Sequence, residues 1–249
     1  MSVRMLTTDL LSLLNDLVLT ASDEAGLAGC AGILLHTSRV DEGAEPGGTN
    51  VLVGTSTNGT AVGHCWAEAG GTLPPTLLPI QYVNALRVAL GKLITKDNRA
   101  THITDLRRDG DDVVIAEDPD LFGGGFTQRF GAGDLDDWPR GAFAVLGTVH
   151  LTPPTDARPV ENRTDFPAAR LTPFLVIAQR HGGQLSLYRV HQALNVHIQI
   201  GVHYRAVVVP SGQWNDSGTD GGGPDIGVYP ADLPPLKTAD EPNPEPAHA

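Results

Sequence analysis

The sequence predicts an α+β fold in which helices pack on one face of antiparallel sheets. Leucines recur at helical spacing over residues 10–18, which predicts an amphipathic helix. The dipeptides Asn58-Gly59 and Asp109-Gly110 each separate two strand-like segments and are typical of tight hairpin turns. Residues 78–118 and 171–210 share one plan, a helix with an early proline followed by alternating strands, and this repetition indicates duplicated modules.

Length and composition are those of an ordinary globular protein. The 249 residues, 41% of them apolar, suffice for one or two domains with their own cores. No run of about eighteen apolar residues occurs, and Met1–Met5 lacks a signal-peptide h-region, so we expect a cytoplasmic protein with no membrane partner. Cys30 and Cys65 are able to form a disulfide, but in that compartment we expect both to be reduced and buried.

The first segment is predicted to run helix, strand, strand, strand. Thr7 or Thr8 is a suitable N-cap for the leucine-rich helix, because a hydroxyl oxygen accepts from the free N–H groups of the first turn. Strands are predicted at residues 31–36, 51–55 and 61–69, with the Asn58-Gly59 turn joining the last two.

A second helix is predicted from Pro79 to about Leu93, since proline is favoured at the first helical position and an apolar stripe follows it. Lys92 and Lys96 lie opposite that stripe and Arg87 lies at its margin, so this helix has a basic side. Strands are predicted to follow at residues 101–106, 113–117 and 126–130, and the first module should close near Trp138-Pro139.

The second copy of the plan is shorter. Pro173 is predicted to open its helix with Thr172 as the N-cap, Arg180 lies near the helix end, and Gly182-Gly183 terminates it. A strand at residues 185–190 comes next. Residues 196–208 alternate between apolar and other residues, which predicts one long strand with an exposed polar side made by His197, Gln199, His203 and Arg205.

The net charge of −12 comes from 29 acidic residues against 17 Lys and Arg. The segment Ser211–Ala249 holds seven of the acids and a single base, Lys237, and it is rich in proline and glycine. Such a composition cannot offset the entropy of ordering by burying apolar surface. We therefore expect an acidic, mostly disordered tail, and the body of the chain carries the other half of the charge.

Several short motifs resemble those of bacterial DNA polymerase sliding clamps and occur in the same order. Ala28–Thr37 is similar to the clamp strand of pattern small-G-V-L-L-x-A that follows a leucine-rich helix. Val53–Val62 resembles the V-A-T-D-G-x-R-L-A hairpin, with Asn58 in place of the usual aspartate. Tyr204–Pro210 resembles the closing Y-x-x-V-V-M-P strand, and Asp134–Pro139 is similar to the acidic, aromatic-proline junction that ends a clamp domain.

The resemblance covers residues 6–139 well and 166–210 in part, which implies two DNA-clamp-like modules. These are module 1 at residues 1–139 and a shortened module 2 at residues 140–210, followed by the tail at 211–249. Only some thirty residues, 140–170, are available for the first half of module 2. Either that half is eroded, or the chain holds one domain and a fragment that a partner completes.

The resemblance also implies a function without catalysis, cofactor or metal. Clamps form homo-oligomeric rings around duplex DNA, tether the DNA polymerase and are opened by a clamp loader, and short relatives imply a phage or other mobile element as a source. Six modules per ring and two per chain would require three chains. Helices line the hole, so the implied non-specific phosphate contacts are Arg87, Lys92, Lys96, Arg170 and Arg180. A groove for client peptides is implied beside the closing strand, at Val207, Val208, Val209 and Pro210.

Plainer alternatives exist for each of these assignments. Lys and Arg opposite an apolar stripe form the solvated face of any surface helix, and the valines are ordinary sheet core. A clamp-fold protein that binds a replication partner without encircling DNA is a second functional hypothesis, and the shortened module favours it. A small hydrolase is a third, but no nucleophile and base converge, since His64 and Cys65 are strand neighbours that point to opposite faces. His191, His197 and His203 match no metal-ligand spacing.

Overall fold

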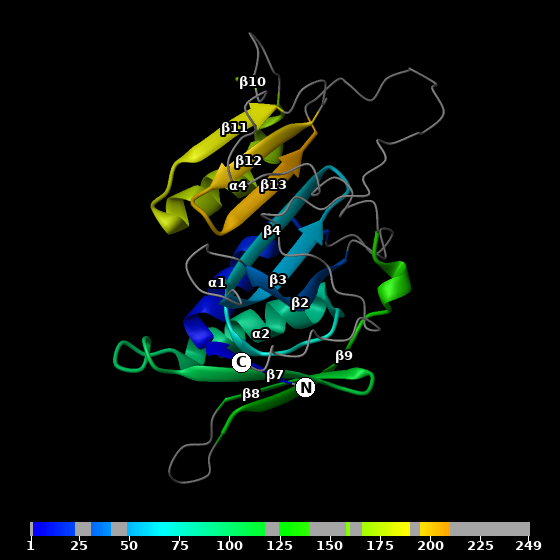
Figure 1. Ribbon diagram of the computed structural model, residues 1–249, viewed down its shortest axis with the longest axis vertical. Helices are drawn as coiled ribbons and strands as arrows, with labels where there is room; N and C mark the ends of the chain where they lie inside the picture. The colour runs from blue at the N-terminus through cyan, green and yellow to red at the C-terminus, as the bar shows by residue number, and fades with distance from the viewer. Residues whose placement is uncertain are drawn as a thin grey trace, which may run out of the picture.

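The computed structural model describes seven stretches of the chain, residues 2–22, 31–40, 49–117, 125–139, 158–159, 166–189 and 195–209. They form two antiparallel sheets and three α-helices, which confirms the predicted α+β class. The larger sheet has eight strands in the order β10-β11-β12-β13-β4-β3-β2-β6, and the smaller has five in the order β5-β1-β7-β8-β9. Figure 1 shows α1 and α2 between the two sheets and α4 behind the β11–β13 part of the larger one.

Three successive units repeat one order of elements, strand, helix, strand, strand, strand. Unit 1 consists of β1 (Ser2–Leu6), α1 (Thr7–Leu17), β2 (Gly32–Val40), β3 (Thr49–Thr57) and β4 (Ala61–Glu68). Unit 2 consists of β6 (Thr76–Pro79), α2 (Ile80–Leu93), β7 (Ile103–Asp109), β8 (Asp112–Glu117) and β9 (Thr127–Gly131). Unit 3 consists of β10 (Arg158–Pro159), α4 (Ala168–His181), β11 (Leu185–Arg189), β12 (Val196–Ile200) and β13 (Tyr204–Val208). The sequence plan therefore occurs three times, and the two stretches found by pattern are units 2 and 3.

Units 1 and 2 exchange their first strands. β1 pairs with β7 of unit 2, with Ser2 opposite Arg107, and β6 pairs with β2 of unit 1, with Gly32 opposite Pro79. Each of these strands runs without a break into the helix of its own unit, so it points away from its own second strand. The exchange makes units 1 and 2 one interlocked body, which we call the paired module.

Unit 3 is built differently at its beginning. Its first strand, β10, pairs with β11 of the same unit, with Pro159 opposite Tyr188. The last strand, β13, pairs with β4 of unit 1, so the eight-stranded sheet runs across the predicted module boundary at residue 139. The division into modules at 1–139 and 140–210 stays a prediction, and the tail at 211–249 lies outside the described residues.

A single apolar cluster joins the inner faces of both sheets and all three helices. Leu10, Leu14 and Leu17 of α1 are 0–1% exposed, as the leucine spacing predicts. Helix α1 approaches β3 closely at Gly54, where a Cβ atom would overlap the Cδ1 atom of Leu17. The β3–β4 and β7–β8 hairpins are also as predicted, with Gly59 and Gly110 at φ values of +81° and +61°.

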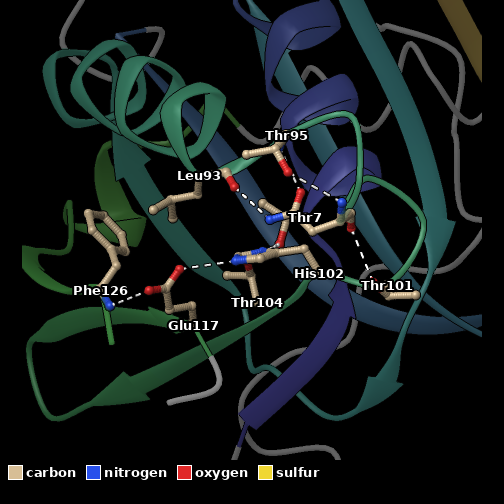
Figure 2. Close-up of polar contacts among 9 residues, drawn as sticks. Thr7, Leu93, Thr95, Thr101, His102, Thr104, Glu117 and Phe126 are labelled. Carbon is tan, nitrogen blue, oxygen red and sulfur yellow. Dashed lines mark hydrogen bonds and ion pairs between the residues drawn. The ribbon is translucent and has the colours of Figure 1, made fainter. Parts of the chain in front are cut away.

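The predicted N-cap of α1 is wrong, because the helix begins at Thr7 itself and Leu6 occupies the cap without a side-chain bond. The Thr7 hydroxyl instead bonds His102 Nδ1 at 2.7 Å and the Thr104 hydroxyl at 2.6 Å. Figure 2 shows that this chain continues from His102 Nε2 to Glu117, 3.1 Å away, whose other carboxylate oxygen accepts from the Phe126 N–H at 2.8 Å. Thr7 thus ties the start of α1 to β7 and β8.

The predicted start of α4 is also wrong. The helix begins at Ala168, directly after Pro167, and Pro173 lies inside it. The Thr172 hydroxyl donates to the carbonyl of Ala168 at 2.8 Å, so it serves the first turn rather than capping a new helix. The earlier proline is the initiating one, and Pro173 omits one backbone hydrogen bond near the N-terminal end of the helix. Gly182, at φ +60°, ends the helix as predicted.

The long strand predicted over residues 196–208 is two strands. Gly201, at φ +58°, lies in the turn between β12 and β13, which pair antiparallel with Val196 opposite Val208. A period-2 pattern continues through a short hairpin whenever the turn preserves the parity of the residues, so the pattern alone did not reveal the break. The polar side is also mostly buried: His197 and Arg205 are at most 1% exposed, while His203, in the turn, is exposed.

Candidate nucleic-acid interface

The three helices meet along a seam of polar side chains. Arg87 of α2 donates from Nε to the Oδ1 atom of Asn15 on α1, at 2.6 Å. The neighbouring residue, Asp16, forms an ion pair with Arg180 of α4 and accepts a second contact from His181 Nε2 at 2.6 Å. Side chains from α1, α2 and α4 therefore converge at the seam, so all three units contribute polar groups to it.

The seam holds two guanidinium groups and one carboxylate. Asp16 is buried, with a side chain 4% exposed, whereas the side chain of Arg180 is 33% exposed. Partial burial, and then the nearby charge of Arg180, lower the pKa of Arg87. Arginine nevertheless stays charged at neutral pH, so the seam keeps a net positive charge with one of its two arginines neutralised.

The structure places the five predicted phosphate contacts in different settings. Arg87 and Arg180 lie together at the seam, and Lys92 is exposed in the last turn of α2. Arg170, in the first turn of α4, donates from Nη1 to the backbone carbonyl of Val209 at 2.7 Å. Lys96 is exposed but does not lie on the helix, which is a correction to the predicted helix face.

Asn98 explains why the helix ends before Lys96. Its side-chain amide donates to the carbonyl of Leu93 at 2.9 Å, and its Oδ1 atom accepts from the N–H of Thr95 at 2.7 Å. The amide of Asn98 therefore satisfies a terminal helix carbonyl that would otherwise continue the helix. Lys96 lies in the turn that follows, about one helical turn beyond the end of α2.

The acidic excess of the chain does not lie in the described residues. They include 14 of the 17 Lys and Arg but only 12 of the 29 Asp and Glu, a net charge of +2, and the remaining segments therefore carry −14. The sequence alone assigned half of the negative charge to the body. The segments of residues 1–210 outside the described stretches carry −8, which together with +2 gives the −6 of the body. The net charge of −12 therefore does not argue against phosphate binding by the described residues.

The closing strand offers no open groove at the predicted residues. Val207 and Val208 are both buried, with Val208 in the main apolar cluster. Val209 is half-buried, and its N–H donates to the carbonyl of Thr60 at 3.1 Å. Pro210 lies outside the described residues. The three described valines are thus buried or half-buried beside β4, and a client-peptide groove at residues 207–210 stays a prediction.

The outer face of the large sheet carries a buried polar cluster that sequence reasoning missed. The Nδ1 atom of His64 lies 2.9 Å from the Thr55 hydroxyl, and Arg205 stacks over the ring of Trp66 at 4.6 Å. Burial, the neighbouring His36 and the charge of Arg205 lower the pKa of His64 to about 3. The β4–β13 pairing places Arg205 opposite His64 and diagonal to Trp66, so this contact could be predicted only once that pairing was known.

Cys65 lies on the opposite face of β4 from His64, as predicted. It belongs to the main apolar cluster, and burial raises the pKa of its thiol well above the ordinary value. A thiol that stays protonated and a histidine on the other side of the sheet cannot act as nucleophile and base. Cys65 is a free, buried cysteine, as expected, and Cys30 lies outside the described residues.

One cavity of about 480 Å³ lies between α1, the end of β4 and the β12–β13 turn. Its lining combines apolar groups, Leu13 and Val202 among them, with the carboxylates of Asp9, Asp16 and Glu68. Of the histidines considered as ligands, His197 stacks on Tyr188 and His203 packs against Trp66, while His191 is outside the described residues. Within the described stretches, no cluster of three or more possible metal ligands occurs.

None of the helices in the described part of the chain combines the length and the apolar run needed to cross a bilayer. A scan of protein-family models finds no match to the sequence, and no curated protein is significantly similar to it. Comparison of the structure with solved structures, in contrast, gives many significant matches.

The structure is similar to the DNA polymerase III beta subunits of Thermotoga maritima and Pseudomonas aeruginosa, with TM-scores of 0.56 and 0.57 at 12% and 10% identity. It is also similar to the Caulobacter crescentus beta sliding clamp, with a TM-score of 0.55 at 16% identity. These alignments cover 86%, 87% and 84% of this chain. The chain has the fold of a DNA sliding clamp.

The sliding-clamp fold is present here in a shortened form. The alignments span 66%, 66% and 65% of the three solved chains, so the protein corresponds to about two thirds of their length. With three units in the described residues, this clamp fold contains one paired module and one single unit. At such low identity the likeness establishes the fold, and what the chain binds is a separate question.

Proposed function

We propose that the chain is a sliding-clamp-like processivity factor without catalytic activity. It would form a homo-oligomeric ring around duplex DNA in the cytoplasm, contact the phosphates without sequence preference, and tether a DNA polymerase after opening by a clamp loader. The observation that carries this proposal is the clamp fold combined with the positive balance of its described residues.

The placement of the bases supports the same proposal. Arg87, Lys92 and Arg180 belong to helices, Arg87 and Arg180 meet at the seam, and Lys92 and Lys96 are exposed. Contacts from such groups to phosphates are independent of base sequence and weaken with salt, which is the behaviour that sliding requires. Arg170 is the weakest of the five candidates, because its guanidinium already donates to the chain's own backbone.

Retention on circular DNA tests the proposal directly. A closed ring loaded on a nicked plasmid should stay bound during gel filtration, and cutting the plasmid once should release it. The affinity for DNA of protein that has not been loaded as a ring should fall as the salt concentration rises, because each phosphate contact releases counterions. Equal retention on circular and linear DNA, or none on either, would contradict encirclement.

Charge reversal identifies the side of the fold that faces DNA. Lys92→Glu with Lys96→Glu should abolish plasmid retention, whereas Arg107→Glu should leave it intact. Arg107 is a suitable control, because it is exposed on β7, on the face opposite the buried Leu106 and away from the helices. Both proteins should keep the wild-type circular dichroism spectrum, since exposed substitutions of this kind usually change stability by less than about 0.5 kcal/mol.

A clamp-fold protein that binds a replication partner without encircling DNA is the second candidate. Two observations favour it: Asp16 neutralises Arg180 at the seam, and the exposed side of α2 presents Val88, which is apolar, beside Lys92. This alternative predicts that the protein is retained by a replication protein on affinity resin while plasmid retention is absent. Loss of that capture in Val88→Glu but not in Arg107→Glu would support it.

A further inference from the structure

The flank of α4 is uncovered where the corresponding flanks in the paired module are covered. There, α1 and α2 pack on each other between the two sheets (Figure 1). Among the described residues, unit 3 has one helix on one sheet, and no second helix packs along the side of α4 that faces away from unit 1.

The position of Leu175 shows which flank this is. Helices α2 and α4 both follow a proline, Pro79 or Pro167, and both are 14 residues long. The eighth residue is Arg87 in α2, where it bonds Asn15 of the neighbouring helix, and Leu175 in α4. Leu175 therefore occupies the helix position that, in α2, contacts the neighbouring helix. The side chain of Leu175 is nevertheless 57% exposed, and that of Val176 beside it is exposed as well.

The sheet under α4 also carries an apolar residue that is more exposed than its counterparts in the paired module. Leu187 of β11 lies opposite Ile198, which is fully buried in the main cluster, so both side chains are on the helix-covered face. Leu187 is nevertheless 36% exposed. The inward residues of the equivalent strands in the paired module, Leu35 of β2 and Leu106 of β7, are only 1% exposed.

The edge of this sheet needs no strand from another unit. β10 pairs with β11 in the place that an exchanged first strand occupies in the paired module, and eight residues between Pro159 and Ala168 give it the reach to do so. The sheet order first, second, third, fourth strand occurs three times, with the first strand supplied by the other unit in units 1 and 2 and by the same unit in unit 3. Among the described residues, unit 3 thus has its first strand but has no cover for the apolar surface formed by Leu175, Val176 and Leu187.

We propose that a second copy of this chain supplies that cover. Two unit 3s would associate about a two-fold axis, with α4 packed on α4 and the apolar surface of each buried against the other. The paired module is the precedent, because the complement of each unit there is a unit of the same plan. A two-fold interface is self-complementary, so the same three apolar residues serve both sides.

The association also sets the size of the proposed ring, and this part alone rests on the proposed function. Each dimer would be an arc of three modules, two paired modules joined by β4–β13 pairing to the completed one. Six modules, the number that the clamp resemblance implies, then require four chains instead of three. The dimer itself is independent of DNA and is measured without it.

Light scattering coupled to size-exclusion chromatography tests the interface on the full chain. The wild type should have the mass of two or four chains at about 100 µM, and Leu175→Glu or Leu187→Glu should weaken association of unit 3 at least about tenfold. Val88→Glu and Val202→Glu are matched controls, because both valines are more exposed than Leu175 but lie on α2 and at the β12–β13 turn. Both controls should keep the wild-type mass.

A cross-link distinguishes the two-fold from other interfaces and does not depend on disruptive variants. In a Cys30→Ser background, Leu175→Cys should give a covalent dimer with a short bismaleimide, whereas Val202→Cys should not. Cys65 is buried and stays unreactive. A monomeric wild type at about 100 µM, absence of the Leu175→Cys dimer, or an oligomer that both glutamate variants leave intact would overturn the proposal. If the dimer forms but the protein is not retained on circular plasmid, the proposed DNA ring is contradicted and the dimer proposal stands.

Discussion

Asp16 of α1 and Arg180 of α4 form an ion pair that joins unit 1 to unit 3 across the helix layer. The two residues are 164 positions apart in sequence, and their helices belong to different units. His181, the next residue of α4, contacts the other oxygen of the same carboxylate. This pair supports the β4–β13 junction from the helix side, where the sheet pairing alone would leave unit 3 held along one strand.

Replacing Asp16 by asparagine should destabilise the protein. The variant leaves a partly buried guanidinium without its counter-charge, and we expect a loss of about 2 to 3 kcal/mol, below the full value for a buried pair because Arg180 is one-third exposed. Urea denaturation followed by circular dichroism measures the change. Asp9→Asn on the same helix is the control and should shift stability by less than about 0.5 kcal/mol.

The same variant should strengthen DNA binding if the seam faces phosphates. Asp16→Asn removes the charge that neutralises Arg180, so the apparent affinity for short duplex DNA should rise and its dependence on salt should steepen by up to about one phosphate contact. Fluorescence anisotropy at several salt concentrations gives both quantities. An unchanged salt slope in a folded Asp16→Asn protein would mean that Arg180 does not contact DNA.

Acid should destabilise the fold through His64. Its pKa is about 3 in the folded protein against 6.5 ordinarily, so between those values the unfolded chain binds a proton that the folded one excludes. The free energy of unfolding therefore falls as pH falls through this window, by about 2 kcal/mol between pH 7 and pH 5 from this group. His64→Gln should remove that part of the pH dependence, and His203→Gln, an exposed histidine, should retain it.

Two glycine substitutions with opposite expected effects on stability test the contact between α1 and β3, one at that contact and one away from it. Gly54→Ala should destabilise by about 1 to 3 kcal/mol, because its methyl group overlaps Leu17 in a filled core. Gly91→Ala has open space and lies inside α2, so it should stabilise by about 0.5 to 1 kcal/mol. Thermal melts of both variants measure the difference. Equal effects of the two would show that α1 can move away from the sheet freely.

Removing residues 211–249 should strengthen DNA binding. That segment carries a net charge of −6, half of the chain's −12, so the truncated protein has a weaker overall negative field. We expect faster association with duplex DNA at low salt and a smaller difference at high salt, where screening removes the effect. Stopped-flow fluorescence measures the rates, and a truncated protein that associates no faster than the full chain would contradict the electrostatic argument.

The elements with strong local signals were predicted correctly. The Asn58-Gly59 and Asp109-Gly110 hairpins need a residue at positive φ, and the leucines of α1 can be satisfied only by a buried helix face, so short sequence windows determine both. The clamp fold followed from the order of such motifs. The starts of helices were harder to predict from the sequence. Thr7, for example, makes its hydroxyl bonds with His102 and Thr104, which are nearly one hundred residues away.

The candidate site was predicted only in part, since it depends on contacts between units. Helical spacing gave the exposure of Lys92. It could not reveal that Asp16 pairs with Arg180, because that requires the packing of α1 against α4. The burial of Arg205 was missed for a related reason, since the split of residues 196–208 into two strands and the stacking on Trp66 both depend on the β4 pairing. Unit 1 was not recognised as a further copy of the plan, although its helix and three following strands were predicted.

The exchange of β1 and β6 has a consequence for how the protein is made. When β1 leaves the ribosome its partner, Ile103–Arg107, is still about one hundred residues from being synthesised, so the strand has no neighbour on that side until then. Neither half of the interlocked body can reach its native sheet alone, and the search for this distant pairing raises contact order, which slows folding. The nascent segment that contains β1 is thus exposed to aggregation and to binding by chaperones until β7 of unit 2 has been translated.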